Sequence, residues 1–380
     1  MRLTQANDTA SEGLVLAVAL ELSSASWKVA LQDGRREKPA LYTSKAELAQ
    51  ARLAEVVKRI EQMKLKWGLP AGVRVAIVYE AGQDGFWIAR ALTALGYEAY
   101  VTDPASVVVS RQQRRAKTDR LDAIRLVNAL RGWLRGERDC MRMVHLPTPE
   151  AEAQRHAIRE RGQLQKEVQA HRDRMGKLLR TLGCWEAVGE KFRERLPTLR
   201  GADGAALPAP LRERLERECE RLARAQEQLA RLEQALIAEL PAPLQERIES
   251  LQKLKAVGWV GATRLVLELF WRKFDNRRQV GSCVGLVPQP YDSGNTRSDQ
   301  GISKQANRRV RALAIEMAWM WLRYQPDSAL TRWFQQRTQG SAHNKRHRRI
   351  AIVAVARRLI ISLWQYLEYG VVPQGACFKA

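Results

Sequence analysis

The 380-residue chain is predicted to combine an α/β domain with two mainly helical regions. Short apolar runs alternate with helix-periodic stretches in residues 1–145, leucines recur at seven-residue spacing in 146–250, and helical patterns dominate 251–380. Strands that alternate with helices after an opening hairpin are typical of an α/β domain with a mixed sheet. A leucine heptad is typical of a coiled coil.

The first domain is predicted to open with a β-hairpin and then to alternate helices with strands. Continuous apolar runs bounded by turn residues indicate buried strands, and apolar residues at helical spacing indicate helices. The predicted elements are strands over 14–21 and 27–32, a helix over 45–67, a strand over 74–80, a helix over 86–95, a strand over 97–102 and a helix from Asp119.

The central region is predicted to be a helical coiled-coil hairpin. Leu215, Leu222, Leu229 and Leu236 are seven residues apart, which indicates one apolar seam along a helix. A second long helix is predicted over 151–182, and a proline-containing connector separates the two. Two alternatives stay open, because the hairpin can pack on itself in a monomer or join two copies of the chain.

The third region is predicted to be mainly helical and to open with a helix-hairpin-helix-like element. Gly258 and Gly261 lie between two helical stretches, where backbone N–H groups at a helix start can bind a phosphate. A tight helix–helix turn is the alternative origin of such glycines. A polar loop carrying Ser293 and Ser303 follows, and then an apolar helix over 312–322.

The charge of the chain favours a polyanionic partner. Lys and Arg number 64 against 41 Asp and Glu, which gives a formal net charge of +23. Such an excess favours nucleic acid as the partner. A membrane is less favoured, since the sequence shows no apolar run near the roughly 20 residues of a spanning helix and no signal peptide. The five cysteines form no Cys-x-x-Cys pair, so a structural zinc is not expected.

Four acids form the candidate metal site. Asp119 and Asp122 are three positions apart at a predicted helix start and therefore share a face. Glu21 and Glu80 each end a strand-like run, at the carboxyl edge where open sheets place their sites. Carboxylate oxygens suit Mg²⁺. Each acid alone has an ordinary explanation, helix capping or a solvated strand end, so the prediction depends on the ordered set.

On these motifs the chain resembles the DEDD-type insertion-sequence transposases. The N-terminal likeness covers about residues 14–130 and carries the Glu-Ala-Gly and Lys-Thr-Asp-x-x-Asp signatures. The C-terminal likeness covers about 251–364 and carries Gly-Leu-Val-Pro, Ser-Gly and Gly-Ile-Ser-Lys-Gln. Two positions depart from the usual pattern: the first acid, generally Asp, is Glu21, and Ala306 stands where the loop often has Gly.

The resemblance implies a RuvC-like (RNase H-like) N-terminal domain and a DNA recombinase. In such an enzyme the acids hold one or two Mg²⁺ ions against the scissile phosphate, and a serine attacks it to form a covalent serine–DNA intermediate. The implied metal ligands are Glu21, Glu80, Asp119 and Asp122, and the implied nucleophile is Ser293, with Ser303 as the alternative.

The implied partners are DNA, a structured guide RNA that pairs with target and donor DNA, and further copies of the chain in a dimer or tetramer. The implied location is the prokaryotic cytoplasm, at the nucleoid. Basic clusters are candidates for contacts with the nucleic-acid backbone. They comprise Arg111, Arg114, Arg115 and Lys117; Lys304, Arg308, Arg309 and Arg311; and Lys345, Arg346, Arg348 and Arg349.

Two other classes of protein remain as alternatives. A RuvC-like structure-specific endonuclease of the Holliday-junction resolvase type would use the same acids with water as the nucleophile. A non-catalytic nucleic-acid-binding protein would need the charge but not the acids. The second set of signatures favours recombination, because a nuclease has no need of it.

Overall fold

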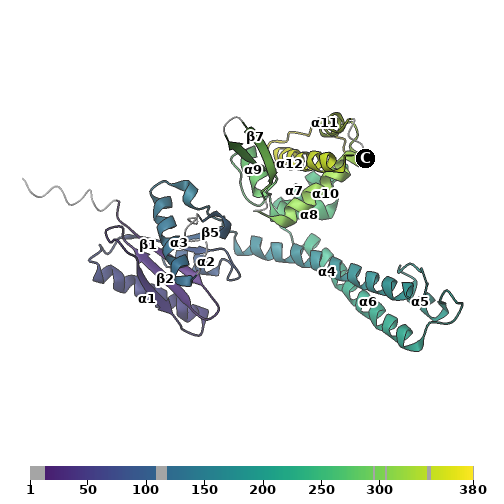
Figure 1. The fold of residues 1–380 in the computed structure, drawn as a ribbon, viewed down its shortest axis with the longest axis horizontal. Helices are drawn as coiled ribbons and strands as arrows, with labels where there is room; N and C mark the ends of the chain where they lie inside the picture. The colour runs from purple at the N-terminus through teal and green to yellow at the C-terminus, as the bar shows by residue number, and fades with distance from the viewer. Residues whose placement is uncertain (1–12, 108–117, 294–295, 304–305, 340–343, 380) are drawn as a thin grey trace, which may run out of the picture. The chain divides into compact units, whose positions relative to one another are not determined.

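The chain divides into two compact units, Met1–Pro147 and Thr148–Ala380. Their elements are drawn in Figure 1. A further division of the second unit into a helical hairpin and a C-terminal domain stays a prediction. The computed structural model describes residues 13–107, 118–293, 296–303, 306–339 and 344–379.

The first unit is built on a five-stranded mixed sheet with the order β3-β2-β1-β4-β5. The first three strands are antiparallel neighbours, whereas β4 and β5 run parallel to β1. The prediction of a mixed α/β domain is therefore confirmed. The edge strand β3 was not predicted. The strands are β1 (Val15–Leu22), β2 (Trp27–Gln32), β3 (Ala40–Ser44), β4 (Arg74–Glu80) and β5 (Glu98–Thr102).

The two faces of this sheet carry side chains of different size. Alternate residues of a strand point to opposite faces. Leu16, Val18 and Leu20 belong to the core that α1 and α2 cover, whereas Ala17 and Ala19 belong to the core that α3 covers. Small alanine side chains allow α3 to pack close to the strands. The helices are α1 (Ala49–Lys66), α2 (Trp87–Ala94) and α3 (Asp119–Leu134), with the short 3₁₀ turns η1 (Pro104–Ser106) and η3 (Arg138–Cys140).

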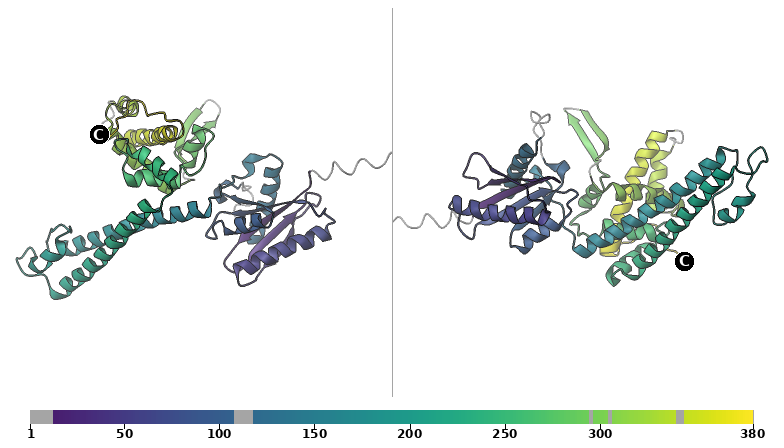
Figure 2. Two further views of the ribbon diagram at one scale, coloured as in Figure 1. Left: turned by 180° about the vertical axis from the view of Figure 1, so that it is seen from behind. Right: turned by 90° about the horizontal axis from the view of Figure 1, so that it is seen from below.

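The second unit begins with a long helical hairpin, whose two arms run side by side in Figure 2. The arms are antiparallel, because Arg161 near the start of one pairs with Glu233 near the end of the other at 2.8 Å. Buried side chains such as Met175 and Leu215 fill the space between them. That the hairpin is a coiled coil stays a prediction. Its elements are α4 (Pro149–Arg180), α5 (Phe192–Arg195), η4 (Leu196–Thr198) and α6 (Ala209–Ala238).

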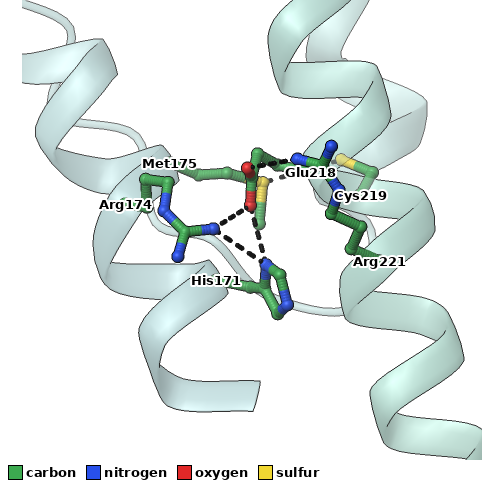
Figure 3. Close-up of polar contacts among 6 residues, drawn as sticks. All are labelled: His171, Arg174, Met175, Glu218, Cys219 and Arg221. Atoms are coloured by element: carbon green, nitrogen blue, oxygen red, sulfur yellow. Dashed lines mark hydrogen bonds and ion pairs between the residues drawn. The ribbon is translucent and has the colours of Figure 1, made fainter. Parts of the chain in front are cut away.

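A buried carboxylate joins the two arms in the half of the hairpin nearer their connection (Figure 3). Glu218 of α6 is only 3% exposed, and its side chain accepts hydrogen bonds from His171 Nδ1 at 2.7 Å, Arg174 at 2.6 Å and Arg221 at 2.8 Å. Burial by itself would raise the pKa of Glu218, but the hydrogen bonds from His171 and the arginines outweigh it and hold the pKa below its ordinary value. The network therefore stabilises the hairpin as long as Glu218 is ionised.

Replacing Glu218 by alanine should destabilise the hairpin by about 1–3 kcal/mol, because two cross-helix hydrogen bonds to a charged group are lost while both arginines stay hydrated. The folded pKa is depressed, so this contribution is fully present above the ordinary pKa of 4.5 and is lost as the pH falls through the folded value. Urea unfolding followed by circular dichroism at pH 7 and at pH 3 measures both effects.

The matched control for this measurement is Glu220→Ala. Glu220 is exposed on the same helix and contacts Arg193 at 3.5 Å. Its removal should change the free energy of unfolding by no more than about 0.5 kcal/mol. Equal effects of the two substitutions at pH 7 would show that the buried network contributes nothing.

The remainder of the second unit packs around one central helix, α12. Val355, Leu359 and Leu363 of this helix are fully buried and join a core to which the surrounding helices contribute. Within the described residues, α12 is the one helix long and apolar enough to cross a membrane, although no run of that length was expected from the sequence. Its burial in this core is typical of a central helix of a globular unit. The helices are α7 (Ala242–Gln252), α8 (Trp259–Glu268), α9 (Arg277–Cys283), α10 (Arg308–Tyr324), α11 (Ala329–Thr338) and α12 (Lys345–Tyr369).

The segment predicted as a polar loop contains a β-hairpin, so that prediction was wrong. Strands β6 (Pro288–Ser293) and β7 (Thr296–Ile302) form an antiparallel pair. Their polar side chains gave no apolar run, although Gly-Asn between two such segments is a hairpin signal in the sequence. Helix α10 also begins earlier than predicted, because the Asn307 side chain accepts hydrogen bonds from two backbone N–H groups of its first turn.

Candidate active site

Two of the predicted acids end neighbouring parallel strands. Leu20 of β1 lies opposite Tyr79 of β4, so Glu21 and Glu80 follow at the same level. Neighbouring strands are about 4.8 Å apart. Alternation along each strand places both glutamates on the sheet face of Ala19, the face that α3 covers. Both residues are half-buried.

The direction of α3 brings its first turn to the same end of the sheet. The Arg131 guanidinium lies beside Gly34, just after the end of β2. Because Gln32 of β2 lies opposite Ala17 of β1, this end of β2 lies near the beginning of β1. The later turns of α3 therefore lie near the start of β1. Its first turn lies toward the carboxyl end, where Glu21 is found.

The other two acids are on this first turn. Thr118 caps α3 by accepting a hydrogen bond from the Leu121 N–H at 3.2 Å. Asp119 is exposed, whereas Asp122 is half-buried and accepts a hydrogen bond from the Arg125 Nη1 at 2.8 Å. The carboxylates at this helix start are favoured by the helix dipole.

The structure thus brings the four acids to one face and one end of the sheet, but it does not gather them into a closed metal-binding shell. No group of three or more His, Cys, Asp or Glu side chains in the described parts of the chain is arranged to hold a metal ion. Carboxylate oxygens are nevertheless the ligand type that Mg²⁺ prefers. Convergence of the acids would require rotation of the glutamates and separation of Asp122 from Arg125.

The two candidate nucleophiles lie at opposite ends of the β6–β7 hairpin. Ser293 is the last residue of β6 and pairs with Thr296 beside the turn. Ser303 follows β7 at the base, where its backbone N–H donates to the Val287 carbonyl at 3.0 Å. From Val287 to Ser293 the strand spans about 20 Å at roughly 3.3 Å per residue. The two serines are therefore too far apart for one phosphate to contact both.

A residue shortly before α10 has a strained backbone conformation. Ala306, at the position where the family resembled often has glycine, adopts a φ of +116°. Such a φ is costly for a residue with a Cβ atom and is readily adopted by glycine. The Arg311 side chain contacts the Ser303 carbonyl at 3.4 Å, which links the first turns of α10 to this loop.

The predicted basic clusters have different surroundings. Arg309 on α10 pairs with Glu268 at 3.3 Å, a carboxylate whose side chain is fully buried, so this arginine has a structural partner. Arg308 is exposed at the start of the same helix. The cluster on the first turns of α12 is exposed and comprises Lys345, Arg346, Arg348 and Arg349. The cations that lie outside the described residues are Arg111, Arg114, Arg115, Lys117 and Lys304.

Sequence reasoning missed a further group of charged residues in the second unit. Arg277 and Arg278 at the start of α9 line one cleft together with Arg357 and Arg358 of α12. The sequence shows each of these two pairs of consecutive arginines, but nothing in the local sequence indicates that the two pairs lie in one cleft. Glu268 was also missed, although it is the one acid in the apolar run Leu265–Phe270.

A family model and two relatives that are similar to this chain are all described as transposases. The model of the transposase IS116/IS110/IS902 family matches residues 248–332. The predicted transposase y4rJ of Sinorhizobium fredii is 39% identical over 377 residues, covering 95% of this chain and 94% of that protein. The transposase for insertion sequence element IS1111A of Coxiella burnetii is 27% identical over 271 residues, covering 70% and 71% of the two chains. The chain therefore belongs to the IS116/IS110/IS902 family of transposases.

Proposed function

We propose that this transposase cuts and rejoins the DNA of an insertion sequence through a covalent serine–DNA intermediate, in a reaction that depends on Mg²⁺. The observation that carries the proposal is the placement of Glu21 and Glu80 on adjacent parallel strands, with the acids of α3 at the same end of the sheet. This layout supports a RuvC-like first unit. The family match over 248–332, which spans both candidate serines, supports a second contribution from the C-terminal region.

The four acids would hold the metal. When bound, Mg²⁺ would polarise the scissile phosphate and stabilise the negative charge that develops on it. Glu21 and Glu80 have three rotatable side-chain bonds each, so they would turn toward a common point by exchanging their present contacts for the metal. Asp122 would exchange Arg125 for the metal, and exposed Asp119 is free of helix packing.

The serine would supply the nucleophile. As the Ser293 Oγ forms its bond to phosphorus, the bond from phosphorus to a sugar oxygen of the DNA breaks. The hydroxyl proton goes to water, and the departing oxygen takes up a proton. One phosphate ester replaces another, so a second DNA hydroxyl can reverse the step on a new strand without an external energy source. Hydrolysis would lose that capacity.

The partners in this proposal are DNA, a structured guide RNA and further copies of the chain. A formal charge of +23 suits a protein that binds phosphate backbones and leaves sequence recognition to base pairing. Exchange between two duplexes requires about four cleavages, which a homodimer pair or a tetramer provides by symmetry. The protein would act in the cytoplasm at the nucleoid.

Incubation of the full-length protein with nicked or bulged DNA and Mg²⁺ tests the proposal. We expect a protein–DNA adduct that survives denaturing electrophoresis and falls to background when EDTA replaces the metal, because the phosphate is then no longer polarised. RNA that co-purifies with the protein is retained in one arm and removed by ribonuclease in another. Cut DNA without an adduct would instead support the endonuclease of the Holliday-junction resolvase type.

A further inference from the structure

A cleft of about 600 Å³ in the second unit is lined by residues of α9, α10, α11 and α12. Figure 1 labels these four helices. Its charged lining comes from Arg277 and Arg278 at the start of α9 and from Arg357 and Arg358 on α12. Its apolar lining includes Leu330 of α11 and Ile361 of α12. Cavities of a few hundred cubic ångströms are the size that holds a small organic molecule.

None of the four arginines of this cleft forms an ion pair with an Asp or Glu of the described residues. The arginines that do form such pairs lie outside the cleft. The lining of the cleft contains no Asp or Glu. Guanidinium groups that share one cleft repel one another unless anions neutralise them. Arginine also presents a planar fork of donors that matches the oxygens of a phosphate. The charge of this cleft therefore favours a phosphate-bearing ligand.

The walls of the cleft suit a flat ring in addition to a phosphate. Leu330 and Ile361 offer apolar surface between the arginines. The Arg358 guanidinium lies 4.0 Å from the centre of the Trp333 ring, and this cation–π contact holds it beside the ring. Nucleic-acid bases stack on such guanidinium planes and on apolar side chains. A free inorganic phosphate would leave these walls uncovered.

We propose that this cleft binds one or two nucleotides of single-stranded nucleic acid, with the arginines on the phosphates and the bases against Leu330 and Ile361. Paired bases are stacked inside a duplex and cannot lie against the apolar walls of the cleft, so the ligand is an unpaired segment. Single-stranded DNA and RNA share this chemistry. The site goes beyond the proposed reaction, which assigns these residues no part, and binding here requires neither the acids nor the serine.

The test is fluorescence anisotropy of the full-length protein with labelled oligothymidylate, oligouridylate and a duplex of equal length, measured in EDTA over a series of salt concentrations. Arg277→Gln combined with Arg357→Gln should weaken single-strand binding on the order of tenfold. It should also reduce the slope of log affinity against log salt by about 1.4, since each lost phosphate contact contributes about 0.7. Duplex binding should change by less than about twofold. The DNA and RNA arms identify the preferred strand.

The matched control combines Arg323→Gln with Arg332→Gln. Both arginines are exposed in the same unit, outside the cleft, and the double substitution removes the same charge. Circular dichroism and thermal melting show whether each variant is folded. Equal losses in the cleft and control variants, or equal losses for duplex and single strand, would overturn the proposal. Because the assay contains no Mg²⁺ and reads no cleavage, its outcome is independent of the proposed reaction.

Discussion

Replacing Asp122 by asparagine should lower the rate of DNA cleavage on the order of 10²- to 10³-fold, the loss typical of removing one charged group that stabilises a transition state. Asparagine has the same shape but is neutral, so it weakens a metal shell without opening a cavity. The measurement is the single-turnover cleavage rate on nicked DNA at saturating Mg²⁺. Circular dichroism and thermal melting monitor the fold in parallel.

If Asp122 had a structural role instead of a metal-binding one, a different result would be expected. Substitution of Arg125 distinguishes these two roles. The pair is linked by a hydrogen bond of 2.8 Å between the Arg125 Nη1 and an Asp122 carboxylate oxygen. If this bond were the function of Asp122, Arg125→Gln would be as damaging as Asp122→Asn. We expect Arg125→Gln to keep cleavage within a few-fold of the wild type. Asp139→Asn, an exposed acid of the same unit, is the control for loss of charge.

Replacing Ser293 by alanine should abolish the covalent adduct and reduce strand exchange by roughly 10⁴-fold or more, as loss of a nucleophile does in other covalent enzymes. Binding of DNA should be unchanged, since a single uncharged hydroxyl is removed. The measurement combines a denaturing gel for the adduct, a recombination assay for exchange and an anisotropy titration for binding.

Two other serines of the same segment control this substitution. Ser298 lies within β7, opposite Tyr291, and Ser298→Ala should leave the adduct intact. Ser303→Ala should also leave it intact, because Ser303 lies at the base of the hairpin and not beside the turn. An adduct that persists in Ser293→Ala and disappears in Ser303→Ala would identify Ser303 as the nucleophile. Cleavage that persists in both would favour water as the nucleophile.

The buried strands were predictable because their side chains are apolar on both faces. Val18 and Ile77 lie in runs that helices cover on each side of the sheet, and such runs are recognisable locally. Strand β3 is a short edge strand with Leu41 partly exposed, so it lacks that signal. The β6–β7 hairpin is polar, and only the Gly-Asn pair between its two strands indicated it in the sequence.

The candidate site was predictable in its residue types and in its place at strand ends. The neighbouring positions of Glu21 and Glu80 depend on the parallel pairing of β1 with β4, which no local pattern encodes. Arg125, the partner of Asp122, lies three positions further along the chain but could not be distinguished in the sequence from a solvated cation. The arginine cleft joins Arg278 to Arg357, and only packing of α9 against α12 brings such distant residues together.

Mass spectrometry of the trapped adduct shows whether Ser293 becomes esterified to DNA. The wild-type protein is incubated with DNA and Mg²⁺, denatured, and digested with protease and nuclease. We expect one peptide that carries a nucleotide esterified to Ser293, and we expect the same peptide to be unmodified in Asp122→Asn. Cleaved DNA without any nucleotide-bearing peptide, or a modified Ser293 in equal amount in Asp122→Asn, would contradict it.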